Sequence, residues 1–224
     1  GTLSQAGSGN ITVTGLTSGT AYTFTVTATN DIGTSSASAA SNSITPTSLA
    51  VGDTYGGGVV AYILVSGDSG YDANQQHGLI AATSDQSSGI RWYNGSYVTT
   101  GATGIAVGTG SANTDAIITK QGATETNYAA GLARAYTDGF YTDWFLPSKD
   151  EMEQIFLNRE TITTTAEANG GDDFEHGQQN YYWSSSEYDE EKAWCRMFSV
   201  RTNEGKDFKS QESASYTHLT LLTI

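Results

Sequence analysis

Residues 144–152 read Trp-Phe-Leu-Pro-Ser-Lys-Asp-Glu-Met, and this stretch predicts the start of a helix. Ser148 followed three residues later by Glu151 is a capping box, in which each side chain binds the backbone N–H of the other residue. Apolar residues follow at helical spacing from Met152 onward. The sequence therefore predicts a helix that begins after Ser148 and packs one apolar face against the rest of its domain.

The other elements are predicted from the apolar pattern on either side of this helix. Apolar runs at residues 59–65 and 77–83 predict buried strands. Two further helices are predicted, at residues 114–121 with Asn113 as the N-cap and at residues 128–138. Residues 163–180 are polar and acidic and predict a loop. Shorter strands are predicted at residues 91–93, 181–186, 192–200, 207–209 and 215–224. This order predicts an α+β domain over residues 51–224, with helices flanking a small antiparallel sheet.

The first 47 residues have a different pattern. Tyr22, Phe24, Val26 and Ala28 alternate with threonines, which predicts a strand with one buried face. Residues 30–33 predict a turn, residues 35–44 a further strand and residues 46–50 a linker. Residues 1–47 are therefore predicted to be a separate all-β unit.

The first unit resembles the last three strands of a fibronectin type III domain. The resemblance lies in Gly15-Leu16-x-x-Gly19-Thr20-x-Tyr22 and in Val26-x-Ala28-x-Asn30-x-x-Gly33, with Tyr22 at the place of a tyrosine corner. A whole sandwich has about 100 residues, so the resemblance implies that the chain begins inside a domain. We then expect the strand face that carries Tyr22 to pack on the next domain, to pair with another chain or to be disordered.

The bulk composition excludes several classes of partner. The 224 residues carry 24 acidic and 10 basic side chains, a net charge of −14, which disfavours binding to nucleic acid or to an anionic membrane surface. No apolar run approaches the roughly 20 residues that span a bilayer, so no membrane insertion is expected. The one cysteine, Cys195, excludes an intrachain disulfide. Only five of the acids precede residue 110, so a charged recognition surface is expected in the second half.

The second unit resembles the C-terminal domain family of collagen-like bacterial adhesins. The resemblance is carried by a three-part pattern, Trp144–Met152, then Tyr182-Trp183-Ser184-Ser185-Ser186-Glu187-Tyr188, then Ala193-Trp194 and Phe198. Upstream support comes from Gly52–Gly58, His77–Ala81 and Gly89-Ile90-x-Trp92. It implies a C-type-lectin-like fold, used also by retroelement-diversified variable proteins and by the receptor-binding tips of phages. It implies an extracellular, cell-surface or virion protein that binds a glycan or a protein receptor. The family ends in a strand with arginines, and residues 216–224 contain none.

The aromatic and serine residues of these strings have a structural interpretation. Large aromatic side chains dominate protein cores, so Trp144, Trp183 and Trp194 are predicted to be core residues. Ser184–Ser186 lack the Gly-x-Ser-x-Gly frame of a nucleophile elbow and are predicted to be small packing residues.

Residues 188–216 are the candidate binding segment. Apolar residues there, including Phe208, are predicted to form a fixed frame, while the residues between them have every chemical type. We hypothesise that the intervening residues contact the ligand and are diversified; an ordinary solvated charged surface is the alternative. The predicted contact residues are Asp189, Glu190, Lys192, Cys195, Arg196, Arg201, Glu204, Lys206, Asp207 and Lys209.

Other functions were weighed against binding. A formylglycine-generating type of enzyme shares the fold but uses a pair of cysteines, and a glycosidase needs two carboxylates about 5–10 Å apart in a cleft. A third alternative is a structural cap of a surface stalk or tail fibre. We predict a binding protein that is not an enzyme and needs no cofactor, although Asp172, Asp173 and Glu175 could together bind calcium.

Overall fold

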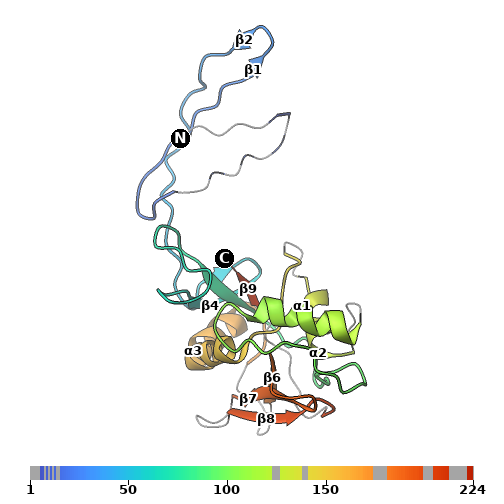
Figure 1. The fold of residues 1–224 in the computed structure, drawn as a ribbon. Coiled ribbons are helices and arrows are strands. Elements are labelled where there is room, and N and C mark those ends of the chain that lie inside the picture. The colour runs from blue at the N-terminus through green and yellow to red at the C-terminus, as the bar shows by residue number, and fades with distance from the viewer. Residues whose placement is uncertain are drawn as a thin grey trace. The chain divides into compact units, whose positions relative to one another are not determined.

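The computed structural model describes residues 6–7, 9, 11, 13, 16–122, 127–137, 141–173, 181–198, 204–211 and 221–223 (Figure 1). The chain divides into two compact units, Gly1–Leu49 and Ala50–Ile224. The division falls within the segment 46–50 that the sequence predicts as a linker.

The first unit is a long hairpin around the strands β1 (Thr29–Asn30) and β2 (Gly33–Thr34). The side chain of Asn30 accepts hydrogen bonds from the backbone N–H groups of Ile32 and Gly33 and so closes the turn. At the other end, Tyr22 and Ile44 exchange two backbone hydrogen bonds. The Tyr22 hydroxyl accepts a hydrogen bond from the Thr17 N–H, five residues upstream, as in a tyrosine corner.

Three serines spaced three residues apart replace the regular ladder between these ends. Each serine donates its N–H to a carbonyl of the facing segment, and its hydroxyl oxygen accepts the N–H of that same facing residue at 3.0 Å. The facing pairs are Ser35 with Ala28, Ser38 with Val26, and Ser41 with Phe24. Each step of two residues along 24–28 therefore faces a step of three residues along 35–41. Because of this mismatch, the two predicted strands are hydrogen-bonded to each other but form a regular β-ladder only near the turn.

The second unit contains two antiparallel sheets. The first consists of β3 (Thr54–Tyr55), β4 (Gly58–Ile63), β5 (Gly78–Ala82) and β9 (Leu221–Thr223), in the order β3-β4-β5-β9. The second consists of β6 (Tyr181–Glu187), β7 (Lys192–Met197) and β8 (Glu204–Phe208), in that order. Figure 1 shows the second sheet at the end of this unit away from β9.

Three helices flank these sheets, α1 (Gly110–Gln121), α2 (Ala129–Ala135) and α3 (Lys149–Ala168). The predicted capping box is confirmed at the start of α3. The Ser148 hydroxyl accepts from the Glu151 N–H at 3.3 Å, and the Glu151 carboxylate accepts from the Ser148 N–H at 2.6 Å. Glu151 also accepts from the Gly108 N–H at 2.8 Å, so the same carboxylate fixes the loop before α1.

The core lies in two parts. One part joins α3 to the first sheet through Val59, Leu79, Met152, Ile155 and Phe156. The other joins α1 and α2 to β6 and β7 through Trp92, Ile117, Tyr128, Leu146 and Trp183. Ser184–Ser186 are buried, as their predicted packing role requires. Helices around small antiparallel sheets make this an α+β arrangement, which confirms the predicted class.

Several predicted boundaries are wrong. Helix α3 continues to Ala168 and so includes the first part of the predicted loop 163–180. Helix α1 begins four residues before residue 114, and Asn113 is not its N-cap because its amide pairs with the backbone of Gly104. Residues 91–93 form no strand, although the Trp92 N–H donates to the Lys209 carbonyl. Strand β8 begins at Glu204 rather than at residue 207.

None of the helices in the described residues is long and apolar enough to cross a membrane.

Candidate functional site

The strand alternation of β7 and β8 divides their side chains between two faces. Ala193 and Cys195 point into the core, where both are buried. The intervening residues point outward, and the register places three pairs directly opposite one another on that side. The pairs are Lys192 with Phe208, Trp194 with Lys206, and Arg196 with Glu204. We call Tyr188, Lys192, Trp194, Glu204, Lys206 and Phe208 the outer face.

Three aromatic rings lie on the outer face. Tyr188 is 50% exposed and Phe208 is 41% exposed, whereas Trp194 is half-buried. Tyr188 meets Trp194 edge to face, with the ring centroids 5.5 Å apart and the planes at 85°. The predicted core role is confirmed for Trp144 and Trp183, which are buried, and is wrong for Trp194.

Lysine ammonium groups lie over these rings. Lys206 Nζ is 3.5 Å from the ring centroid of Tyr188 and 4.6 Å from that of Trp194. Lys192 Nζ is 4.8 Å from the centroid of Phe208. A cation over an aromatic face is attracted by the ring quadrupole by about 0.5–1 kcal/mol at an exposed site. These contacts hold the lysines near the rings but leave them free to move when a ligand binds.

Helix α3 supplies a further cation at the edge of the outer face. Lys149 Nζ lies 2.7 Å from Glu204 Oε1 and 5.2 Å from the Trp194 ring centroid. Burial alone would lower the pKa of Lys149, but its hydrogen bond and charge pairing with Glu204, together with Asp150, raise the pKa instead. Lys149 is therefore a fixed positive charge beside the indole.

Arg196 is a structural residue of the α3–β7 contact. Its guanidinium forms an ion pair with Glu153 and lies 3.9 Å from the ring centroid of Phe156. Burial lowers the pKa of Arg196, and the charges of Glu153 and Glu204 act in the opposite direction. Arg196 shares the outward side of β7 with Lys192 and Trp194, but α3 covers it there, so it is buried and is not part of the exposed outer face.

The predicted contact residues divide into three groups. Four are exposed, Asp189, Glu190, Glu204 and Lys206, and two are half-buried, Lys192 and Asp207. Three were expected on the surface but are buried, Cys195, Arg196 and Lys209, and we remove them from the candidate site. The remaining residue, Arg201, lies outside the described residues.

The buried group has a simple physical explanation. Cys195 alternates with its neighbours into the core, and burial, followed by the charges of Asp207 and Glu204, raises its pKa to about 12. Lys209 follows the last residue of β8 and turns inward to a buried carboxylate. Phe208, which was predicted to belong to the fixed apolar frame, points outward. Lys209, which was predicted to contact the ligand, points inward.

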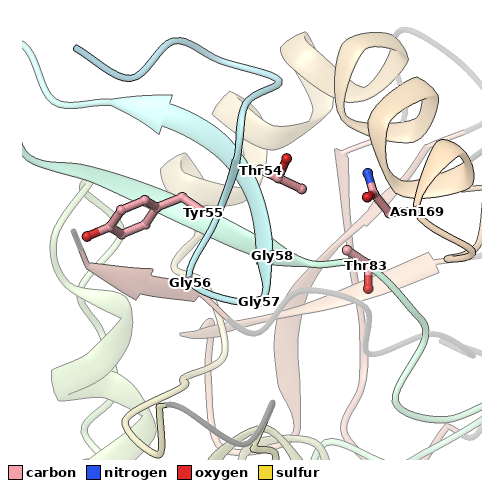
Figure 2. Close-up of a pocket in the computed structure, with 7 residues that line it drawn as sticks. All are labelled: Thr54, Tyr55, Gly56, Gly57, Gly58, Thr83 and Asn169. Carbon is pink, nitrogen blue, oxygen red and sulfur yellow. The ribbon is translucent and has the colours of Figure 1, made fainter. Parts of the chain in front are cut away.

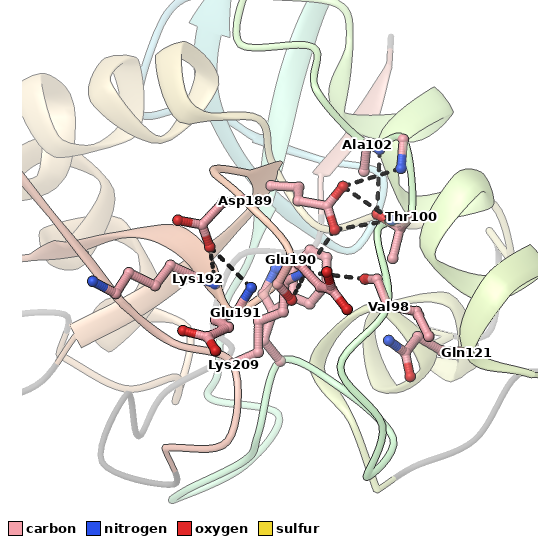
Figure 3. A network of polar contacts seen from close by, with 12 residues as sticks. Val98, Thr100, Ala102, Gln121, Asp189, Glu190, Glu191, Lys192 and Lys209 are labelled. Atoms are coloured by element: carbon pink, nitrogen blue, oxygen red, sulfur yellow. Dashed lines mark hydrogen bonds and ion pairs between the residues drawn. The ribbon is translucent and has the colours of Figure 1, made fainter.

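A polar network anchors the turn beside the outer face (Figure 3). Lys209 Nζ lies 2.5 Å from Glu187 Oε1 and donates to the carbonyls of Val98 and Glu190. Glu187 in turn accepts from the Thr100 N–H at 2.9 Å. Tyr188 follows Glu187 directly and Phe208 precedes Lys209 directly, so this network fixes the backbone below two of the exposed rings.

The turn between β6 and β7 is acidic. The Asp189 carboxylate accepts from the N–H groups of Glu191 and Lys192 at 2.9 and 2.7 Å, so one of its oxygens is committed to the turn. Asp189, Glu190, Glu191 and Tyr97 line a hollow of about 400 Å³ next to it. The hollow extends the candidate site beyond the Lys192–Phe208 pair.

A second hollow, of about 350 Å³, lies at the first sheet (Figure 2). It is lined by Thr54, Tyr55, Gly56, Gly57, Gly58, Thr83 and Asn169. Figure 2 shows the Tyr55 ring directed away from Thr83 and Asn169. None of the described residues that line it is acidic or basic, so it offers less for chemistry or recognition than the outer face.

The candidate calcium residues are only partly described. The Asp172 carboxylate accepts from the Asp85 N–H at 3.0 Å, while Glu175 lies outside the described residues. Within the described part of the chain, no group of three or more His, Cys, Asp or Glu residues could hold a metal ion.

Sequence reasoning missed three members of the candidate site, Tyr188, Trp194 and Phe208. A signal was present, because Lys192, Trp194 and Arg196 share one strand face by their spacing of two. Which face points outward depends on the packing of β6 and α3, and the sequence pattern of β7 alone does not define it.

A scan against protein-family models finds no match, and a search of curated proteins finds no significantly similar sequence.

Proposed function

We propose that this chain is an extracellular recognition protein, at a cell surface or on a virion, whose outer face binds a glycan or a protein receptor. The observation that carries the proposal is the set of exposed rings of Tyr188 and Phe208 beside Trp194, on a sheet whose other side is core. Solvent-exposed aromatic groups set among charged side chains are typical of binding sites. The rigid sheet below them keeps the site in place before a ligand arrives.

The proposed fold class is a C-type-lectin-like domain of the collagen-like adhesin type, after a fibronectin-type-III-like segment. The helices that flank two small antiparallel sheets support the first assignment. The contact between the Tyr22 hydroxyl and the Thr17 N–H supports the second. In this proposal the outer face is the place where sequence diversification would change the ligand, since exposed strand residues can vary without disturbing the core.

The state of Cys195 supports binding rather than catalysis of the formylglycine-generating type. That chemistry uses a pair of active-site cysteines, and the sequence has one. Burial raises the pKa of this thiol to about 12, so almost no reactive thiolate forms at neutral pH.

The test is to probe glycan and protein-receptor arrays with the full chain and with the variants Trp194→Ala and Tyr188→Ala. The proposal predicts that the wild type binds at least one probe and that either variant weakens this binding by about tenfold or more. Tyr71→Ala is the matched control, because Tyr71 is 42% exposed but lies on the loop after β4. Binding that is retained by the Trp194 and Tyr188 variants, or lost equally by the control, would reject the outer face as the site.

A further inference from the structure

Three lysine side chains gather on or beside the outer face of an acidic protein. The chain has a net charge of −14, yet Lys149, Lys192 and Lys206 all lie within 5.2 Å of a ring centroid on or beside the outer face. The charged members of the outer face are Lys192, Lys206 and Glu204, two positive and one negative, so this face carries a net charge of +1, opposite in sign to that of the whole chain. Such a local reversal attracts an anionic group.

Two of these lysines have no carboxylate partner in the part of the chain that the structure describes. Lys149 is paired with Glu204. Lys192 and Lys206 instead lie over aromatic rings, which supply only a weak attraction. An anion at Lys206 would gain a charge-assisted hydrogen bond without breaking an existing ion pair.

The position of the acidic turn decides where an anionic group would lie. Residues 189–191 precede the Lys192–Phe208 pair, at one end of the outer face. Lys206 is opposite Trp194, one pair further along, and Lys149 approaches the same indole from α3. The anionic group is therefore best placed at Lys206, away from the acidic turn.

The composition of the outer face favours a sugar over a protein partner. The cores of protein–protein interfaces are depleted in Lys and Glu, whereas here each exposed ring adjoins one of them. A sugar has a C–H face that packs on an indole, because those hydrogens are attracted by the negative ring face. Its hydroxyl groups can exchange hydrogen bonds with Glu204 at the edge of the face.

We infer that the outer face binds a glycan that carries a carboxylate group, with the sugar ring on Trp194 and the carboxylate at Lys206. This inference rests on the proposed function, since it names the ligand class of the same surface. Sialic acids and uronic acids both carry a carboxylate on a sugar ring, and either would fit this inference.

The experiment measures binding of the full chain by titration calorimetry or ligand-observed NMR to four probes. Sialyllactose is compared with lactose, and trigalacturonate with α-1,4-linked galactotriose, so that each acidic sugar has a neutral counterpart. We expect one acidic probe to bind about tenfold more tightly than its neutral counterpart, the difference that one charge-assisted hydrogen bond supplies. The probe that binds identifies which of the two acidic sugars is the source. The preference should shrink when salt is raised to about 0.3 M.

Three lysine variants separate a specific contact from overall charge. Lys206→Gln should abolish the acidic preference, and Lys206→Arg should retain it. Lys120→Gln removes the same charge from an exposed position near the end of α1 and should leave binding unchanged. Equal loss in the Lys206→Gln and Lys120→Gln variants would overturn the inference.

The other outcomes also decide between the proposals. Tighter binding of a neutral sugar, or of an acidic peptide, that still requires Trp194 would overturn the acidic-glycan inference and keep the proposed function. Absence of binding to all four sugars would overturn the inference, while the receptor arrays would still test the proposed function. Sugar binding that is unaffected by Trp194→Ala would overturn both.

Discussion

Lys209 and Glu187 form a fully buried ion pair, with Nζ 2.5 Å from Oε1 and side-chain exposures of 0% and 2%. Both charged groups of the pair also form hydrogen bonds with the backbone. The ammonium also donates to the Val98 and Glu190 carbonyls, and the carboxylate accepts from the Thr100 N–H. The pair thus joins three segments that are far apart in the sequence, and two of these segments carry the exposed aromatic rings of the outer face.

Lys209→Met should destabilise the second unit by about 3–5 kcal/mol, because it leaves the Glu187 carboxylate buried without its counter-charge. The measurement is urea unfolding followed by tryptophan fluorescence, since Trp92 lies 4.7 Å from Lys209 Nζ and reports on this region. The double variant Lys209→Met with Glu187→Gln should recover part of the loss.

The matched control is Asp115→Asn, which breaks an ion pair with Arg134 in which the carboxylate is 69% exposed. An exposed pair contributes about 0–1 kcal/mol, so this change should have little effect. If Lys209→Met cost no more than the control, the buried pair would not be an anchor.

Glu151 should make stability depend on pH. Burial raises its pKa above the ordinary value of 4.5, against the opposing hydrogen bonds from Ser148 and Gly108. A carboxyl with a raised folded-state pKa binds its proton more tightly in the folded state. Its contribution is therefore complete below pH 4.5 and is lost as pH rises through the raised value. The free energy of unfolding of the wild type should fall relative to Glu151→Gln over this window.

Glu160→Gln serves as the control, because it removes a carboxylate of α3 that is 77% exposed. Denaturant unfolding at a series of pH values measures the difference between each variant and the wild type. A wild-type curve that runs parallel to that of Glu151→Gln across the whole window would contradict the assignment.

Local signals in the sequence predicted the local structure well. The capping box of Ser148 and Glu151 involves neighbours in sequence, so its geometry follows from the residues alone. The end of α3 was missed because Thr163, Thr164 and Thr165 have low helix propensity, and the contacts of Ile162 and Ala166 with the core override that tendency.

The inward and outward residues of β8 could not be predicted in the same way. A shift of one residue in register moves every side chain to the opposite face, and the register is set by pairing with β7. Burial of Lys209 requires a carboxylate that lies 22 residues away in sequence. Charged residues are almost never fully buried without a partner, so the sequence alone favoured an exposed position.

Cys195 should be chemically inert in the folded protein. Its thiol is buried and its pKa is raised to about 12. Since the thiolate is the reactive form, disulfide-exchange reagents at pH 8 should label the native protein about a hundredfold or more slowly than the protein in urea. Absorbance of the released thiol measures both rates. Rapid labelling of the native protein, at a rate near that in urea, would show that this face of β7 is open to solvent.

The serine hydroxyls that pair the two segments of the first unit should protect the facing amides from hydrogen exchange. Ser38→Ala removes the hydroxyl that accepts the Val26 N–H at 3.0 Å, and the methyl group that replaces it cannot accept a hydrogen bond. The Val26 amide should then exchange with solvent about 5- to 10-fold faster, the effect of losing roughly 1 kcal/mol. Hydrogen exchange followed by NMR measures this amide directly.

Ser36→Ala is the control, because among the described contacts the Ser36 hydroxyl makes no bond to the facing segment. Unchanged exchange of the Val26 amide in Ser38→Ala would mean that backbone pairing alone, through the Ser38 N–H and the Val26 carbonyl, holds the hairpin together.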